Sequence, residues 1–167
     1  MTDSAEPAPQ IWTVPLPDAA ATDALGARLA SALAPGDAVF LIGPLGAGKT
    51  TLARGLIRAA CSDFEVEVPS PTFALIQQYD APNLLISHLD LYRLEKPDEV
   101  LEIGYEEALD QGACLIEWPD RLGPYAPADR LEVALEAAPR GGTERVGRVT
   151  GYGAWAERAQ RLNLNTR

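Results

Sequence analysis

The stretch Leu41-Ile42-Gly43-Pro44-Leu45-Gly46-Ala47-Gly48-Lys49-Thr50-Thr51 decides the fold. Its residues 43–50 match the G-x-x-x-x-G-K-[ST] pattern of a phosphate-binding P-loop. The apolar run at residues 37–42 predicts a short buried strand, and residues 51–60 carry apolar side chains at helical spacing. Strand, loop and helix therefore follow one another in the order that a P-loop requires.

The chemistry of such a loop predicts a nucleoside triphosphate as ligand. Glycines let backbone N–H groups turn toward the phosphates, and the N-terminus of the next helix adds the positive end of its dipole. Lys49 brings an ammonium group to the β and γ oxygens, and the Thr50 hydroxyl is a ligand for Mg²⁺. The predicted nucleotide-binding residues of the loop are Gly43, Leu45, Gly46, Ala47, Gly48, Lys49, Thr50 and Thr51. The alternative is a glycine-rich turn before an ordinary helix.

Length and composition predict one compact domain. The chain has 167 residues, 47% of them hydrophobic, which is enough to bury a single core. Residues 1–10 carry charges and prolines without an apolar block, so we expect a flexible tail, not a signal peptide, before a domain at residues 11–167. No apolar run is as long as a membrane span, and the two cysteines lack metal-type spacing. A reduced, cytoplasmic protein is the simplest interpretation.

The charge balance argues against a free-standing nucleic-acid binder. The chain has 24 acidic and 14 basic residues and a net charge of −10, which repels a phosphate backbone. If RNA is involved, we expect a partner to hold it. Acidic residues gather at residues 95–110, where the pattern predicts a helix with Pro97 near its first turn. Its acidic face is either solvated or a docking surface for a basic partner.

The rest of the pattern predicts an α/β protein. Strands are expected at residues 10–14, 73–79, 84–90, 113–117, 130–137 and 146–152, a turn at 80–83, and helices at 18–33 and 154–164. Pro35-Gly36 ends the first of these helices. We therefore predict a P-loop NTPase-type three-layer fold, with a central, mostly parallel sheet, antiparallel additions and helices on both faces.

Two expected strands end in a carboxylate, Asp90 and Glu117. Ligands of such sheets lie beyond the carboxyl ends of the strands, so both acids are expected near the phosphates. One acid would complete the metal site and the other would orient the attacking water, and the sequence leaves that assignment open. The predicted catalytic residues are Lys49, Asp90 and Glu117, and the predicted metal ligands are Thr50, Asp90 and Glu117. The alternative is that each acid caps its strand or pairs with Arg93 or Arg121.

Four further side chains are candidates with two interpretations each. Ser70 and Thr72, in a loop stiffened by two prolines, are either sensors of the γ-phosphate or part of a plain connection. His88 lies two residues before Asp90 on the same strand face, where a structural role is favoured over a catalytic one. Trp118 either closes over the site or packs.

Four segments together closely resemble the TsaE (YjeE) family. They are Leu-Gly-Ala-Gly-Lys-Thr-Thr at residues 45–51, Ser-Pro-Thr-Phe at 70–73, His-Leu-Asp-Leu-Tyr-Arg at 88–93 and Glu-Trp at 117–118. The resemblance extends from about residue 18 to residue 118, and more weakly to the end. It includes a helix that begins near Thr22 and contains Leu25-Gly26.

The resemblance implies a bacterial cytoplasmic ATPase required to make threonylcarbamoyladenosine in tRNA. Its cofactors would be ATP and Mg²⁺, and its partners would be the transferase TsaD and its companion TsaB, a complex that ATP hydrolysis to ADP and phosphate resets. By the same resemblance, Thr50 and Glu117 hold Mg²⁺, Asp90 and Thr72 act at the phosphates, and Thr22 lies near the nucleotide. The tRNA would be contacted only through the complex, which agrees with the net charge.

Two other functions are compatible with a P-loop. One is a small-molecule kinase with a basic lid at Arg140, Arg145 and Arg148, and the other is a non-hydrolysing scaffold in which ATP orders the Thr72 loop. The chain has no N-K-x-D segment of the kind that reads guanine, which favours adenine. It also lacks an obvious arginine finger, with Arg93 and Arg121 as the candidates, so we expect slow hydrolysis without partners.

Overall fold

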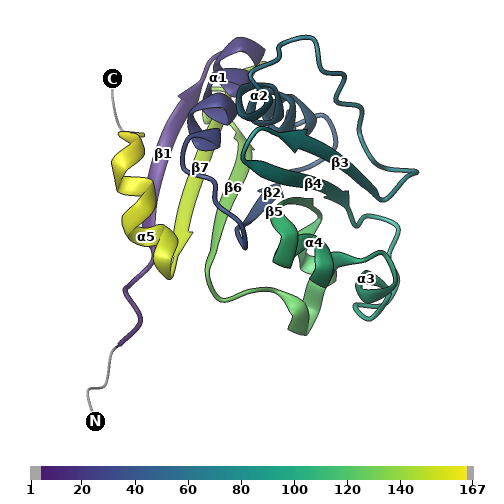
Figure 1. Cartoon of the computed structure of the whole chain (residues 1–167). Helices are drawn as coiled ribbons and strands as arrows, with labels where there is room; N and C mark the ends of the chain where they lie inside the picture. Colours follow the sequence, from purple (N-terminus) through teal and green to yellow (C-terminus); the bar gives the residue numbers. More distant parts are fainter. Residues whose placement is uncertain (1–4, 165–167) are drawn as a thin grey trace.

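The computed structural model describes residues 5–164, and its strands form one mixed seven-stranded sheet (Figure 1). The strands are β1 (Gln10–Leu16), β2 (Ala38–Ile42), β3 (Ile76–Ala81), β4 (Leu84–Asp90), β5 (Gly112–Glu117), β6 (Arg130–Ala137) and β7 (Arg145–Tyr152). Their order is β1-β7-β6-β2-β5-β4-β3. The pairings β2–β5, β2–β6 and β4–β5 are parallel, whereas β1–β7, β6–β7 and β3–β4 are antiparallel. The parallel pairings lie at the centre and the antiparallel ones toward the edges, as predicted, but half of the pairings are antiparallel, so the sheet is mixed and not mostly parallel.

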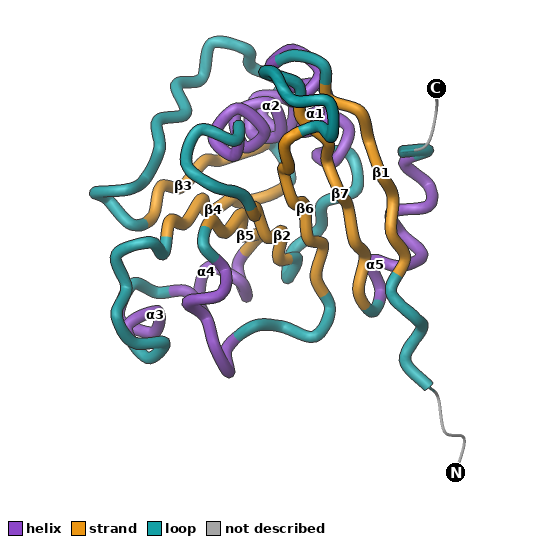
Figure 2. Tube along the Cα trace, turned by 180° about the vertical axis from the view of Figure 1, so that it is seen from behind, coloured by secondary structure: helices purple, strands orange, loops and turns teal. Residues whose placement is uncertain are grey.

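Helices cover both faces of this sheet, as predicted (Figures 1 and 2). One face carries α1 (Ala19–Ala30), α2 (Lys49–Cys61), α5 (Ala154–Arg158) and η2 (Ala159–Leu162), and the other carries α3 (Glu99–Glu102), α4 (Tyr105–Gln111) and η1 (Pro119–Tyr125). The sheet divides the core accordingly. Leu29, Leu52 and Trp155 belong to one buried cluster, and Tyr105 and Leu122 to the other.

Two glycines hold α1 tightly against α2. A Cβ at Gly26 would clash with the carbonyl oxygen of Leu52, and a Cβ at Gly55 would clash with that of Asp23. Neither position has room for a side chain, so the two helix backbones touch. This contact fixes the N-terminal end of α2, and with it the loop that precedes α2, relative to the start of α1.

The acidic segment does not form the one helix predicted at residues 95–110. It forms two short helices, α3 and α4, which meet at Gly104. Gly104 has φ 83°, a left-handed conformation that ends α3 and sets a new direction for α4. The acidic residues are therefore spread over two short helices and the turns beside them.

Other predicted boundaries shift as well, including the end of β1, at Leu16 and not residue 14, and the end of α1, at Ala30 and not residue 33. β3 begins at Ile76 and not at residue 73, because Leu75 has φ 68° and its N–H closes a turn on the Pro71 carbonyl at 2.7 Å. The same strand continues to Ala81, so the turn predicted at 80–83 shortens to residues 82–83. The closing helix predicted at 154–164 is α-helical only to Arg158 and continues as a 3-10 helix.

The predicted tail at residues 1–10 lies partly outside the described residues, because residues 1–4 are not among them. Residues 5–9 have no regular structure, and Gln10 already belongs to β1. Among residues 5–164, no helix combines the length and the apolar character needed to cross a bilayer.

Candidate nucleotide-binding site

The loop between β2 and α2 has the backbone that its glycines predict. Gly43, Gly46 and Gly48 have φ values of 155°, 79° and 106°, which residues with a side chain rarely adopt. Gly48 is the N-cap of α2, and no side chain caps the helix there. The N–H groups of the first turn of this helix are thus available to an anion, with the helix dipole behind them.

A small cavity of about 260 Å³ lies at this end of α2. Its walls bring together seven of the predicted site residues, Leu45, Gly46, Gly48, Lys49, Thr50, Thr51 and Glu117, and add Ser70 and Trp118. The remaining predicted residues, Thr22, Gly43, Ala47, Thr72 and Asp90, do not line this cavity. Gly43 and Thr72 are each hydrogen-bonded to a wall residue, Asp90 lies opposite the wall residue Glu117 in the sheet, and Thr22 lies beside the loop that contains Ala47.

Lys49 is buried, with 6% of its surface exposed. Its Nζ donates a hydrogen bond to the Gly43 carbonyl at 2.6 Å and lies 4.0 Å from the centre of the Trp118 ring. Burial lowers the pKa of Lys49, and the carboxylates of Glu117 and Asp90 act in the opposite direction by favouring the charged form. The ammonium group is thus held by a carbonyl and an aromatic ring near two acids.

The two strand-end acids lie side by side. The parallel register of β4 and β5 places Asp90 opposite Glu117, and both side chains are buried. The alternative ion pairs with arginine do not form. Arg93 stacks on the Phe73 ring at 4.3 Å, and Arg121 donates to a backbone carbonyl of residue 94 at 3.1 Å.

Asp90 is held by donors from its own neighbourhood. Its Oδ2 accepts a hydrogen bond from the Thr72 hydroxyl at 3.1 Å, and its Oδ1 accepts one from the backbone N–H of Tyr92 at 3.0 Å. Thr72 in turn shares a 2.8 Å hydrogen bond with the hydroxyl of Ser70, which lines the cavity. The loop at residues 69–72 is therefore tied to the end of β4.

Glu117 is held differently. Its Oε2 lies 2.8 Å from Nε2 of His88, a side chain that is fully buried. Within residues 5–164, its Oε1 has no hydrogen-bond partner, and Glu117 lines the small cavity. One oxygen of this carboxylate is therefore fixed, and the other is free for a ligand.

Thr22 lies beside the loop, on α1. A Cβ built at Gly48 would be 3.5 Å from the Thr22 methyl carbon, and the Thr22 hydroxyl donates to the Asp18 carbonyl at 3.4 Å. The close packing of α1 on α2 places Thr22 here, so the start of α1 lies near the loop between β2 and α2.

The oxygen donors of this site fit Mg²⁺. Among the described residues, no group of three or more histidine, cysteine or acidic side chains is placed to hold a metal by itself. Thr50, Asp90 and Glu117 supply one hydroxyl and two carboxylates. Mg²⁺ is commonly bound by one or two carboxylates together with substrate phosphates, so the set is appropriate for a metal that arrives with a nucleotide.

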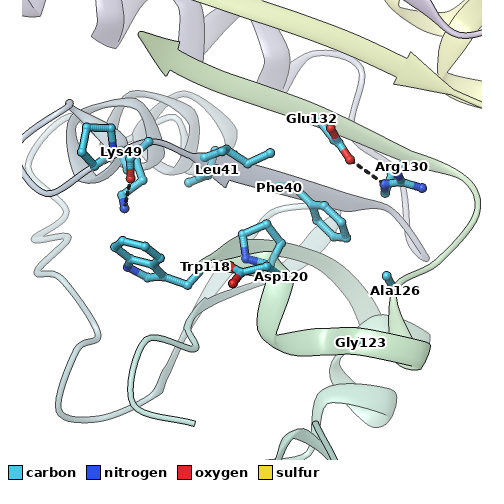
Figure 3. A pocket seen from close by; sticks show the side chains of 13 residues that line it. Phe40, Leu41, Lys49, Trp118, Asp120, Gly123, Ala126, Arg130 and Glu132 are labelled. Carbon is cyan, nitrogen blue, oxygen red and sulfur yellow. Dashed lines mark hydrogen bonds and ion pairs between the residues drawn. The ribbon is translucent and has the colours of Figure 1, made fainter. Parts of the chain in front are cut away.

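A larger cavity of about 660 Å³ lies on the other side of β2 (Figure 3). Apolar side chains of β2 and residues of η1 line two of its walls, and the ion pair of Arg130 with Glu132, at 2.8 Å, lies along another side. Gly46, Gly48 and Thr50 line the small cavity and not this one, so the larger space is not the phosphate site. Lys49 and Trp118 line both and form a common wall.

Sequence reasoning missed the partners of two of these residues. The structure places His88 against Glu117, and Trp118 against Lys49. The sequence feature that could have indicated a role for His88 in the site is the strand face that it shares with Asp90. Trp118 follows the acid that ends β5, but it has φ 58°, and that left-handed backbone turns its ring in a direction that alternation along a strand does not predict.

Comparisons with known proteins agree on one family. The family model described as "Threonylcarbamoyl adenosine biosynthesis protein TsaE" matches residues 16–146. A protein from Rickettsia conorii named tRNA threonylcarbamoyladenosine biosynthesis protein TsaE is 45% identical over 116 residues, which are 70% of this chain and 66% of that protein. A protein of the same name from Bacillus subtilis is 39% identical over 114 residues, covering 67% of this chain and 70% of the relative.

A solved structure extends the likeness to nearly the whole chain. The crystal structure of YdiB from Bacillus subtilis superposes with a TM-score of 0.73 at 29% sequence identity, covering 94% of this chain and 95% of the other. The seven-stranded mixed sheet with its helices is therefore shared with an experimentally determined fold.

Proposed function

The chain belongs to the TsaE family, and we propose that it acts in the biosynthesis of tRNA threonylcarbamoyladenosine as a Mg²⁺-dependent ATPase. The observation that carries this proposal is the small cavity at the start of α2, where Lys49 and Thr50 meet Glu117 from the end of β5. A nucleoside triphosphate is bound by a positively charged side chain and by the N–H groups at the start of a helix, and its metal is bound by an acid at the end of a strand. The cavity brings these groups together.

Binding would begin with an exchange of partners at Lys49. Its ammonium group now contacts the Gly43 carbonyl and the face of the Trp118 ring, and both are weaker partners than a phosphate oxygen. The phosphates would accept hydrogen bonds from the ammonium and from the first N–H groups of α2. The left-handed glycines of the loop leave the space around these donors free of side chains.

Thr50 and Glu117 would hold Mg²⁺, and the bound ion would supply positive charge to offset the negative charge that develops during hydrolysis. The geometry supports this division of labour between the acids. Glu117 has one oxygen fixed on His88 and the other free, as a metal ligand needs. Both oxygens of Asp90 already accept hydrogen bonds, from Thr72 and from the N–H of Tyr92.

Asp90 and Thr72 would act at the γ-phosphate. In hydrolysis, a water oxygen bonds to the γ-phosphorus while the bond to the β-phosphate oxygen breaks, and ADP leaves. Asp90 is the acid anchored by the Thr72 loop, so it would orient the attacking water and accept its proton. Thr72 would sense the γ-phosphate through the same hydrogen bond and pass that information to its loop.

We further propose that the partners are proteins resembling TsaD and TsaB, with tRNA contacted only through them. The net charge of −10 disfavours direct binding to a phosphate backbone. Leu45, a wall residue of the small cavity, is 79% exposed, and Phe73, next to Thr72, is 82% exposed. A partner that docks beside the site would remove both apolar side chains from water, which favours association.

We expect ATP hydrolysis by the purified protein to be slow and to rise at least about tenfold when the TsaD–TsaB pair is added. Neither candidate arginine is directed at the phosphates, since Arg93 stacks on Phe73 and Arg121 donates to a backbone carbonyl. Phosphate release is measured with and without the partners, and Lys49→Ala protein in the same mixture gives the background.

The same assay separates the competing functions. Equal rates with and without partners would contradict partner activation. Phosphate that appears on an added small-molecule acceptor, and not as free phosphate, would indicate a kinase. ATP binding without any phosphate release, alone or in the complex, would indicate a non-hydrolysing scaffold.

A further inference from the structure

We infer that His88 is a positioning residue, which holds the Glu117 carboxylate in the orientation that binds Mg²⁺. The inference rests on the proposed ATPase function and extends it to the side chain that holds the metal ligand in place. His88 Nε2 lies 2.8 Å from Glu117 Oε2, and the two side chains are 0% and 4% exposed. A hydrogen bond this well shielded from water fixes the acid firmly.

The chemistry of the pair sets the tautomer of the ring. An ionised carboxylate only accepts hydrogen bonds, so the hydrogen must be on Nε2 of His88. In the neutral ring Nδ1 then carries a lone pair, and among the described residues it has no hydrogen-bond partner. A buried polar atom without a partner is unfavourable, and an apolar side chain would avoid that penalty. The hydrogen bond from Nε2 to Glu117, on the other side of the ring, is therefore the interaction that a histidine provides here and an apolar side chain would not.

The sheet supplies the rigidity that positioning requires. His88 and Glu117 lie on neighbouring parallel strands, β4 and β5, each of which has another strand on both sides. With Oε2 held by the ring, the rotation of the carboxylate is restricted, and Oε1 remains available where Glu117 lines the small cavity. Groups that orient a metal-binding side chain in this way typically change metal affinity by about 10- to 100-fold when removed.

Two variants at one position test the inference. In His88→Gln, the side-chain amide nitrogen reaches about as far as Nε2 and can still donate to Glu117. In His88→Asn, the amide ends near the position of Nδ1 and cannot. We expect the Mg²⁺ affinity of the ATP-loaded protein, measured by calorimetry, to fall about 10- to 100-fold in the Asn variant. The Gln variant should stay close to wild type, and ATP affinity in EDTA should be unchanged in both.

Ser87→Ala is the matched control for disturbance of the strand. Ser87 is the preceding residue of β4, is also fully buried, and accepts a hydrogen bond from Gln78 at 3.2 Å. Its removal should lower thermal stability without changing Mg²⁺ affinity. Wild-type Mg²⁺ affinity in the Asn variant would overturn the inference and leave the ATPase proposal standing. A wild-type protein whose ATP binding ignores Mg²⁺ would instead contradict the proposed function itself.

A second measurement needs neither metal nor variant. His88 is the only histidine of the chain, so ¹⁵N NMR of the imidazole reports on this one ring. The inference predicts a ring with its hydrogen on Nε2, bonded to Glu117. A ring with hydrogen on Nδ1 alone would place two acceptors against each other and would overturn the inference, even if the Asn variant failed to fold.

Discussion

Lys49→Ala is expected to weaken ATP binding by roughly 10- to 100-fold while the protein remains folded. A hydrogen bond to a charged group contributes about 1.5–3 kcal/mol, and each 1.4 kcal/mol changes an affinity about tenfold. The fold should tolerate the change, because the Lys49 ammonium group contacts one carbonyl and one aromatic ring and its burial disfavours the charged form. Calorimetry with ATP and Mg²⁺ measures the affinity, and a thermal melt checks the fold.

Leu45→Ala is the control in the same loop. Leu45 is 79% exposed, and the substitution keeps the backbone N–H group through which this position would contact phosphate. ATP affinity should therefore stay near the wild-type value. A Lys49→Ala protein that binds ATP as tightly as wild type would show that the cavity at the start of α2 is not the triphosphate site.

Glu117→Gln is expected to lower ATP turnover in the partner complex roughly 100-fold, which corresponds to about 3 kcal/mol in the barrier. Glutamine keeps an oxygen that can accept from His88, so the buried hydrogen bond survives while the charge for Mg²⁺ is lost. ATP binding in EDTA should change little, since Lys49 and the helix N–H groups remain. Glu117→Ala should add a loss of stability, because it leaves the His88 N–H without its partner.

Glu132→Gln makes the same chemical change outside the small cavity. Glu132 pairs with Arg130 at 2.8 Å and lines the larger cavity, so turnover should be little affected. If Glu117→Gln hydrolyses ATP at the wild-type rate, Glu117 is not the metal ligand. If it loses turnover and folding together, Glu117 is structural, and the argument from strand ends fails.

The sequence predicted the features that depend on local pattern. β4 and β6 begin and end where alternation and apolar runs placed them, and the strand–loop–helix order around Gly48 follows from the P-loop pattern. The adjacency of Asp90 and Glu117 also followed, because the carboxyl ends of parallel strands meet at one edge of a sheet. These predictions needed periodicity and the ends of elements, and no knowledge of distant contacts.

The rest depended on single backbone angles and on contacts between distant segments. A positive φ at Gly104 divides the predicted helix into two, and a positive φ at Leu75 makes β3 begin later than predicted. Composition does not predict these backbone angles. The contacts of His88 with Glu117 and of Trp118 with Lys49 depend on which strands are neighbours in the sheet. Local sequence patterns do not predict that order, so these contacts were not predicted. Sites for Mg²⁺, nucleotide and partners stay predictions of the sequence and the family.

The most direct test of triphosphate binding at this site is a crystal structure of the protein with a non-hydrolysable ATP analogue and Mg²⁺. We expect the triphosphate in the loop at residues 43–50, with Lys49 on the β- and γ-phosphate oxygens and the cation between Thr50 and Glu117. An analogue bound elsewhere, or bound here with Lys49 still on the Gly43 carbonyl and Glu117 away from the cation, would contradict it.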